Sequence, residues 1–141
     1  MKNSNSINIL IVDDEPDILE LLKYNLEKED FVVKQASNGF EALEILENFI
    51  PKIIILDVMM PNLDGIETCR KIRELEVHKD VYIMFLTARS EEFTEIAAWE
   101  AEGNDYIIKP IRPRALVTRI KSIFNSNLPK EPNTLNILDL V

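Results

Sequence analysis

Five polar side chains follow four short apolar runs of this sequence, and their types suit phosphoryl chemistry. A carboxylate can accept a phosphoryl group or bind a metal ion, and a hydroxyl or an ammonium group can stabilise the transferred oxygens. Asp13 and Asp14 follow the first run, and the later runs end at Asp57, Thr87 and Lys109. These residues are our candidates for the site.

The apolar runs predict how these side chains are brought together. Runs of this kind are typical of strands buried on both faces, and the residue after each lies at the carboxyl edge of a parallel sheet, where open α/β folds bind ligands. Helical spacing of apolar residues alternates with the runs. We expect strands at 7–12, 31–35, 53–56, 81–86 and 106–108, and helices at 16–28, 39–50, 66–75, 90–103 and 113–124.

This alternation predicts an α/β fold. Short connections favour parallel strands joined by right-handed crossovers, with helices on both faces of the sheet. The prediction is a doubly wound five-stranded parallel sheet with five helices, in residues 1–124. Residues 125–141, which contain Pro129 and Pro132, break the pattern and are interpreted as a linker or tail.

The acids should crowd together at the sheet edge, because the strands that end at Asp13, Asp14 and Asp57 are neighbours in such a sheet. Crowded carboxylates repel one another, and a divalent cation relieves this; hard oxygen ligands with room for water suit Mg²⁺. Asp57 is then the nucleophile, and Mg²⁺, Lys109 and Thr87 each stabilise one phosphoryl oxygen. Any one of these acids alone could be a helix cap or turn residue. Five independent caps would be a coincidence.

Composition excludes several classes of function. The chain has 141 residues, 46% of them hydrophobic and 29% charged, which fits one globular domain. A net charge of -9 argues against direct nucleic-acid binding. Met1 to Ser6 do not form a signal peptide and no membrane-spanning stretch occurs, so a cytoplasmic protein is expected. The single cysteine, Cys69, has no partner for a disulfide and no zinc motif surrounds it.

The candidate residues lie within five longer motifs: Ile11-Val12-Asp13-Asp14-Glu15, Leu56-Asp57-Val58-Met59-Met60-Pro61, Asp64-Gly65, Leu86-Thr87-Ala88-Arg89 and Tyr106-Ile107-Ile108-Lys109-Pro110. On these motifs the chain resembles, over about residues 7 to 124, the receiver domain of bacterial two-component response regulators. The resemblance implies the flavodoxin-like strand order 2-1-3-4-5.

The resemblance also implies a role for each site residue. Asp57 would take a phosphoryl group from a sensor histidine kinase or phosphotransfer protein. Asp14, Asp57 and the main-chain carbonyl of Met59 would bind Mg²⁺, with Asp13 acting through a water. Lys109 would pair with Asp57 and then with the phosphoryl group, and its bond to Pro110 would be cis. Thr87 would move toward the phosphoryl group and Tyr106 would turn inward, as a switch.

The sequence departs from the family pattern near the fourth helix. Ala101-Glu102-Gly103 places the glycine one residue late, so we expect a reshaped helix end. Receivers that pair through helices 4 and 5 carry a basic residue and an acid where this chain has Glu95 and Ala115, although Asp105 and Arg119 remain compatible with that dimer. Trp99, Phe93 and Ile96 are interpreted as core rather than output surface, and His78, in a charged loop, is given no role.

Three functions remain open from the sequence. The first is a phosphoacceptor that controls an attached or separate effector through its helix 4, strand 5 and helix 5 face, as a monomer or a phosphorylation-dependent dimer. It would catalyse only its own phosphorylation and dephosphorylation. The second is a phosphorylation-independent interaction module. The third is a small-molecule phosphotransferase or phosphatase, which should carry a second acid where Met59 stands and a capping insertion that this chain lacks.

Overall fold

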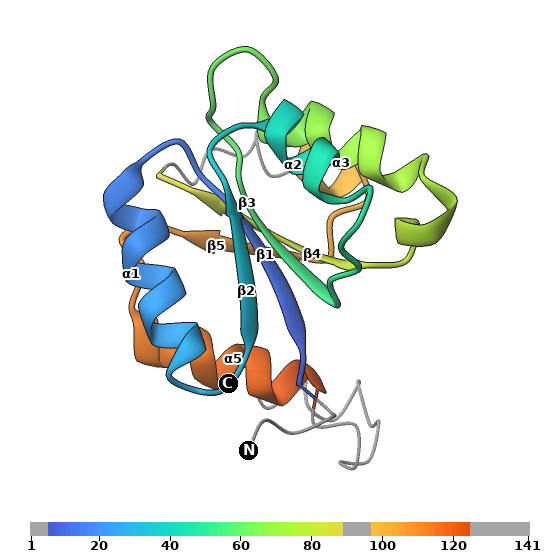
Figure 1. The fold of residues 1–141 in the computed structure, drawn as a ribbon. Coiled ribbons are helices and arrows are strands. Elements are labelled where there is room, and N and C mark those ends of the chain that lie inside the picture. Colours follow the sequence, from blue (N-terminus) through green and yellow to red (C-terminus); the bar gives the residue numbers. More distant parts are fainter. Residues whose placement is uncertain (1–5, 89–96, 125–141) are drawn as a thin grey trace, which may run out of the picture.

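Five parallel strands form the centre of the molecule in the computed structural model, which describes residues 6–88 and 97–124. Their order is β2-β1-β3-β4-β5, so the predicted fold class is confirmed (Figure 1). The strands are β1 (Asn8–Val12), β2 (Val32–Ala36), β3 (Ile53–Asp57), β4 (Tyr82–Thr87) and β5 (Asp105–Ile108).

Two of the strands end differently from the sequence prediction. Asp57 and Thr87 are the last residues of β3 and β4, rather than the first residues after them. Asp57 lies opposite Leu86 in the parallel register of these strands. The polar side chains are therefore fixed by the sheet itself.

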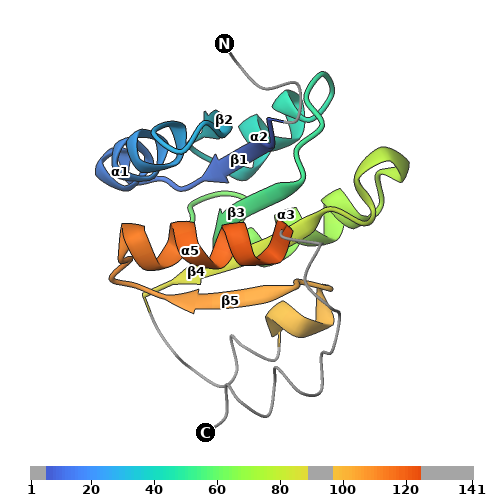
Figure 2. The same cartoon turned by 90° about the horizontal axis from the view of Figure 1, so that it is seen from below.

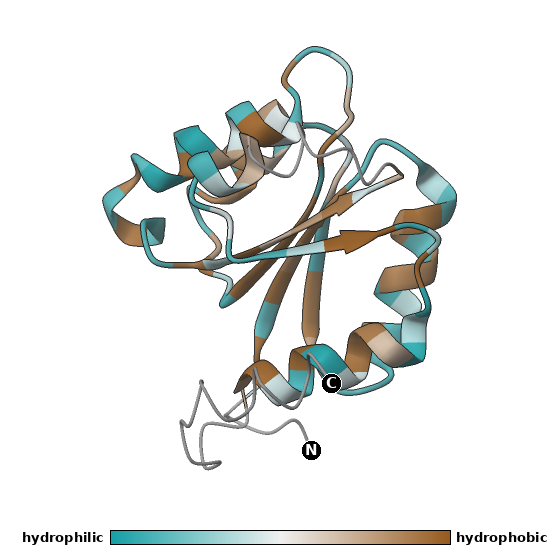
Figure 3. Cartoon of the chain, turned by 180° about the vertical axis from the view of Figure 1, so that it is seen from behind, coloured by the Kyte–Doolittle hydropathy of each residue, from teal (hydrophilic) through white to brown (hydrophobic). Residues whose placement is uncertain are grey.

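Helices cover both faces of the sheet. α1 (Pro16–Glu27) and α5 (Pro113–Phe124) pack on one face, and α2 (Gly39–Ile45) and α3 (Gly65–Arg73) on the other (Figures 1 and 2). Residues of β1 alternate between the two cores: Ile9 and Ile11 face α1 and α5, whereas Leu10 and Val12 face α2 and α3. The strands are apolar along most of their length (Figure 3), as burial on both faces requires.

Local capping explains where two helices begin. The Asn38 side chain accepts a hydrogen bond from the Glu41 N–H at 2.8 Å, which caps α2 at the predicted position. Asp64 caps α3 in the same way through the Glu67 N–H, also at 2.8 Å. α3 ends at Arg73, so Leu75 lies beyond the helix that its spacing predicted.

The end of the fourth predicted helix is reshaped as expected. Residues 97–100 are helical, while residues 89–96, which include the predicted start and Phe93, Glu95 and Ile96, lie outside the described residues. Glu102 has a left-handed backbone with φ 70°, and Gly103 does not. Gly103 instead packs beside the Phe85 ring, where a Cβ would come within 2.3 Å. Trp99 is 50% exposed, so its assignment to the core is wrong.

His78, which sequence reasoning left without a role, is buried. A short 3-10 helix, η1 (Glu76–His78), precedes β4 and places the imidazole in a buried position. Its Nε2 lies 2.8 Å from the Leu46 carbonyl oxygen beyond α2. This contact across 32 residues is not visible in local sequence.

Within the described parts of the chain, none of the helices is long and apolar enough to cross a membrane. The proposed linker, residues 125–141, lies outside them.

Candidate phosphoacceptor site

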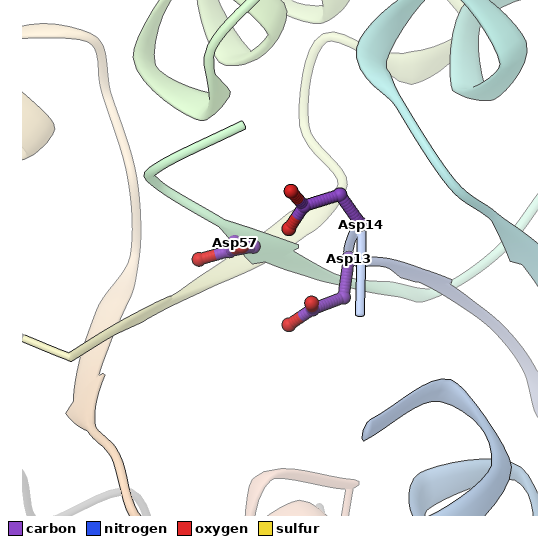
Figure 4. A group of neighbouring side chains, drawn as sticks. All are labelled: Asp13, Asp14 and Asp57. Carbon is purple, nitrogen blue, oxygen red and sulfur yellow. The ribbon is translucent and has the colours of Figure 1, made fainter. Parts of the chain in front are cut away.

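Three carboxylates meet at the carboxyl edge of the sheet. β1 and β3 pair side by side, with Val12 opposite Leu56, so the residues that end these strands are neighbours. One oxygen from each of Asp13, Asp14 and Asp57 lies within 4.8 Å of the others. Figure 4 shows the three side chains extending to the same side of the strand ends. The predicted convergence is confirmed.

The three acids differ in exposure. Asp13 and Asp57 are buried, with 1% and 3% of their surface exposed, whereas Asp14 is exposed. Buried carboxylates need partners, because desolvation disfavours their charged form. Asp13 has two: its Oδ1 accepts the Glu15 N–H at 2.9 Å, and its Oδ2 lies 3.0 Å from the Lys109 Nζ. Glu15 was part of a predicted motif without a predicted role.

Lys109 reaches this cluster from the far side of β4. Its backbone N–H donates to the Thr87 carbonyl at 2.7 Å, and its peptide bond to Pro110 is cis. The ammonium lies 3.7 Å from Asp57 Oδ1 as well as close to Asp13. Burial opposes its charge, but the hydrogen bond to Asp13 and the charge of Asp57 outweigh burial and raise the pKa of Lys109.

The pKa of the Asp57 carboxyl is higher than that of an ordinary surface acid. Burial and the neighbouring Asp13 charge raise its pKa to about 7, although Lys109 and the Met59 N–H lower it. That N–H donates to Asp57 Oδ1 at 3.3 Å. A carboxylate that is destabilised in this way gains from a cation beside it.

A glycine that sequence reasoning left without a role shapes the loop after Asp57. The Gly65 N–H donates to the Val58 carbonyl at 2.9 Å, and a Cβ on Gly65 would come within 2.1 Å of the Asp57 carbonyl oxygen. Only glycine lets the start of α3 approach the strand end this closely. The Asp64-Gly65 pair was the available signal.

Thr87 and Tyr106 occupy neighbouring strands. Thr87 is fully buried at the end of β4, and Tyr106, in β5, is half-buried and packs against the core under α2 and α3. Phe85 lies opposite Tyr106 in the sheet register, two residues before Thr87. The Met59 side chain is exposed and contributes to the site through its backbone.

The donor set fits a small hard cation. Three carboxylates supply oxygen ligands, one of them exposed to solvent, and Mg²⁺ prefers a few carboxylates with several waters. Lys109 supplies only one positive charge to the three acids. The electrostatic balance of the cluster thus favours a further cation.

Comparison with known sequences identifies relatives. The response regulator receiver domain matches residues 9–121. The alkaline phosphatase synthesis transcriptional regulatory protein PhoP of Bacillus subtilis is 42% identical over 89% of this chain and 52% of its own length. The transcriptional regulatory protein ResD of the same organism is 41% identical over 98% and 58%. The transcriptional regulatory protein SrrA of Staphylococcus aureus is 45% identical over 84% and 48%. The chain thus spans about half the length of these relatives.

Solved structures show the same fold. A putative response regulator from Chloroflexus aurantiacus matches with a TM-score of 0.78 and 36% identity, covering 84% of this chain and 98% of that one. The BeF3-activated DrrB receiver domain matches with a TM-score of 0.75 and 30% identity, covering 83% and 96%. The chemotaxis protein CheY4 of Vibrio cholerae has a TM-score of 0.81 at 24% identity, covering 84% and 99%, and supports the fold alone.

Proposed function

The chain belongs to the response regulator receiver domain family, and we propose that Asp57 is its phosphoacceptor, with a sensor histidine kinase or phosphotransfer protein as donor. Receiver domains are signalling domains of two-component systems, and the closely related proteins are named as transcriptional regulators. The observation that carries the proposal is the buried Asp57 carboxylate with two further acids and the Lys109 ammonium beside it.

The proposed reaction is a direct transfer between side chains. An Asp57 oxygen attacks the phosphorus of a phosphohistidine, the P–N bond breaks, and its electron pair stays on the imidazole. The product on this chain is an acyl phosphate. Lys109, 3.7 Å from Asp57 Oδ1, would stabilise one phosphoryl oxygen, and the Thr87 hydroxyl would donate to another.

We propose that Mg²⁺ is required for this transfer. Asp14, Asp57 and the main-chain carbonyl of Met59 would hold the ion directly, and Asp13 would act through a water. The ion would neutralise charge on the acids and on the incoming phosphoryl group. Asp13 is already engaged by the Glu15 N–H and by Lys109, which supports its indirect role.

The output would follow from Thr87 and Tyr106. Movement of the Thr87 hydroxyl toward a phosphoryl group would vacate space beside β4, and Tyr106 would turn inward to fill it. Tyr106 lies between the core and the surface, as such a switch needs. Residues 1–124 would form the receiver and 125–141 a linker or tail, and the greater length of the relatives supports a cytoplasmic effector as the output.

The face formed by β5 and α5 differs from that of receivers that pair through charged residues, because Ala115 stands where those receivers carry an acid. Arg119 donates two hydrogen bonds of 2.8 Å to Asp105 within the same chain. Ala115 offers no charge for a cross-subunit pair, so we propose a partner or dimer arrangement other than the charge-paired one.

Intact mass after incubation with acetyl phosphate tests the proposal. We expect one phosphoryl adduct, labile to hydroxylamine, that requires both Mg²⁺ and Asp57. Asp57→Asn is the test variant and Asp80→Asn, at an exposed position just before β4 and away from the carboxyl edge of the sheet, is the matched control. If the wild type gives no adduct while it is folded and binds Mg²⁺, the phosphorylation-independent module replaces this proposal.

A further inference from the structure

An apolar groove lies at the edge of the molecule opposite Asp57. Its walls are the C-terminal ends of α2 and α3 together with η1, and its volume is about 610 Å³. α2 and α3 lie side by side on one face of the sheet (Figure 1). Because these helices run antiparallel to the strands, their C-terminal ends meet the amino edge of the sheet, and η1 leads directly into β4. The groove is therefore separate from the carboxylate cluster.

The apolar lining is exposed to an unusual degree. Val77 is 66% exposed, Ile50 is 62% exposed, and Leu75 and Leu43 are partly exposed beside them. Single exposed apolar residues are ordinary, but a contiguous group on one surface marks an interaction site. Packing in the two cores described above does not explain why these side chains face solvent.

His78 lines the groove and is itself buried. Its Nε2 must be the protonated nitrogen, because the Leu46 carbonyl 2.8 Å away can only accept a hydrogen bond. Its Nδ1 is buried without a hydrogen-bond partner in the part of the chain that the structure describes. Buried polar groups are normally paired. Because this nitrogen is buried, the imidazole is a reporter of the groove rather than a polar contact for its occupant.

Charges around the groove select the occupant. Glu47, Glu74 and Glu76 line it, with Lys71 as the basic residue among the lining side chains. Glu76 is paired with Lys79 at 3.1 Å, so Glu47 and Glu74 against Lys71 leave the lining with a net negative charge. This excess of acids disfavours nucleic acid and anionic lipid surfaces, which bind basic patches. It favours a partner that presents basic residues beside its apolar contacts.

The walls also select the secondary structure of the occupant. Two helices and a 3-10 turn form the groove, so no strand edge is available there for main-chain pairing. An amphipathic helix with apolar anchors at i, i+3, i+4 and i+7 is the segment that grooves between helices accept. We propose that the α2–α3–η1 groove is a docking site for a basic amphipathic helix of a partner protein, independent of the phosphoacceptor site.

The test uses a synthetic peptide in which leucine recurs at helical spacing and lysine occupies the flanking positions. A scrambled peptide of the same composition and a peptide with glutamate in place of lysine are controls. His78 is the single histidine of the chain, so its imidazole resonances report the groove directly in NMR. We expect the first peptide alone to shift them, together with the amides of Ile50 and Val77.

Variants then test where the peptide binds. Val77→Asp should weaken binding about tenfold, as loss of an anchor contact does, and Glu47→Lys with Glu74→Lys should weaken it about fivefold. Tyr24→Asp is the matched control, because Tyr24 is 65% exposed on α1, across the sheet, and binding should stay unchanged. Both positions are exposed, so each variant should fold.

Three results would overturn the proposal: no shift of the His78 resonances at millimolar peptide, equal binding of the scrambled peptide, or equal weakening by Val77→Asp and Tyr24→Asp. Asp57→Asn should bind the peptide as the wild type does. Failure at this groove and failure of the phosphoacceptor chemistry are therefore distinguishable.

Discussion

The Lys109 ammonium lies closer to Asp13 than to the proposed phosphoacceptor: Nζ is 3.0 Å from Asp13 Oδ2 and 3.7 Å from Asp57 Oδ1. The resemblance to receivers implied a pair with Asp57. In this chain the ammonium bridges two buried acids. Its charge supplies part of the positive potential that a metal ion would otherwise supply. Lys109 therefore weakens the binding of a cation at this site, although both would stabilise the same phosphoryl group.

This relationship predicts opposite effects of Lys109→Gln on two measurements. Mg²⁺ binding should become about three- to tenfold tighter, because a repelling charge is removed, whereas adduct formation with acetyl phosphate should slow by at least about tenfold. Calorimetry gives the first quantity and intact mass the second. Lys79→Gln, which removes an exposed ammonium paired with Glu76, should change neither. Weaker Mg²⁺ binding by Lys109→Gln would contradict the account.

The raised pKa of Asp57 predicts a pH-dependent cost of its charge. With a folded pKa of about 7 against an ordinary value of 3.8, the folded protein holds a proton that the unfolded chain has released between these pH values. The ionised carboxylate thus destabilises the metal-free protein above about pH 7, and this destabilisation fades as the pH falls.

Asp57→Asn should therefore unfold at higher urea concentration than the wild type at pH 8 in EDTA. We expect a gain of order 1 to 3 kcal/mol in the free energy of unfolding, which shrinks as the pH falls below 7 and approaches zero at about pH 4. Urea titrations at several pH values give this difference. A gain that is constant with pH would mean that the Asp57 carboxyl is not perturbed.

Mg²⁺ should stabilise the fold through Asp14. Binding to the folded state alone adds about 1 to 3 kcal/mol at ten to a hundred times Kd, and thermal unfolding measures it. Asp14 is exposed, so Asp14→Asn should fold normally yet lose most of the gain. Asp80→Asn should keep it. Equal stabilisation of Asp14→Asn would place the cation elsewhere.

The left-handed backbone at Glu102 predicts a stabilising substitution. Glycine adopts φ 70° without strain, and the Arg73 guanidinium contacts Glu102 only through its carbonyl oxygen. Glu102→Gly should raise the free energy of unfolding by about 0.5 to 1 kcal/mol. Glu100→Gly, in the helical residues just before, should lower it by a similar amount. The same sign for both variants would contradict this explanation.

Strand order and the convergence of the acids were accessible from sequence because they depend on local patterns. Apolar runs such as Ile53 to Leu56 identify buried strands, and parallel strands bring their carboxyl ends to one edge. The Asn38 cap and the start of α5 at Pro113 also follow from local residue chemistry.

Contacts between distant segments were not accessible in the same way. His78 is buried because η1 packs it against Leu46, and Trp99 is exposed although helical spacing favoured the core. The preference of Lys109 for Asp13 depends on differences of less than an ångström across three strands. Sequence patterns specify which elements meet, but such distances depend on packing.

Chemical mapping of the phosphorylated residue tests the central claim most directly. Borohydride reduces an aspartyl phosphate to homoserine, and peptide sequencing by mass spectrometry then identifies the position. After incubation with acetyl phosphate and Mg²⁺, homoserine is expected at residue 57 alone, with none at Asp13 or Asp14. Homoserine at either of those positions, or at none in a protein that carries a phosphoryl adduct, would contradict the assignment of Asp57 as the phosphoacceptor.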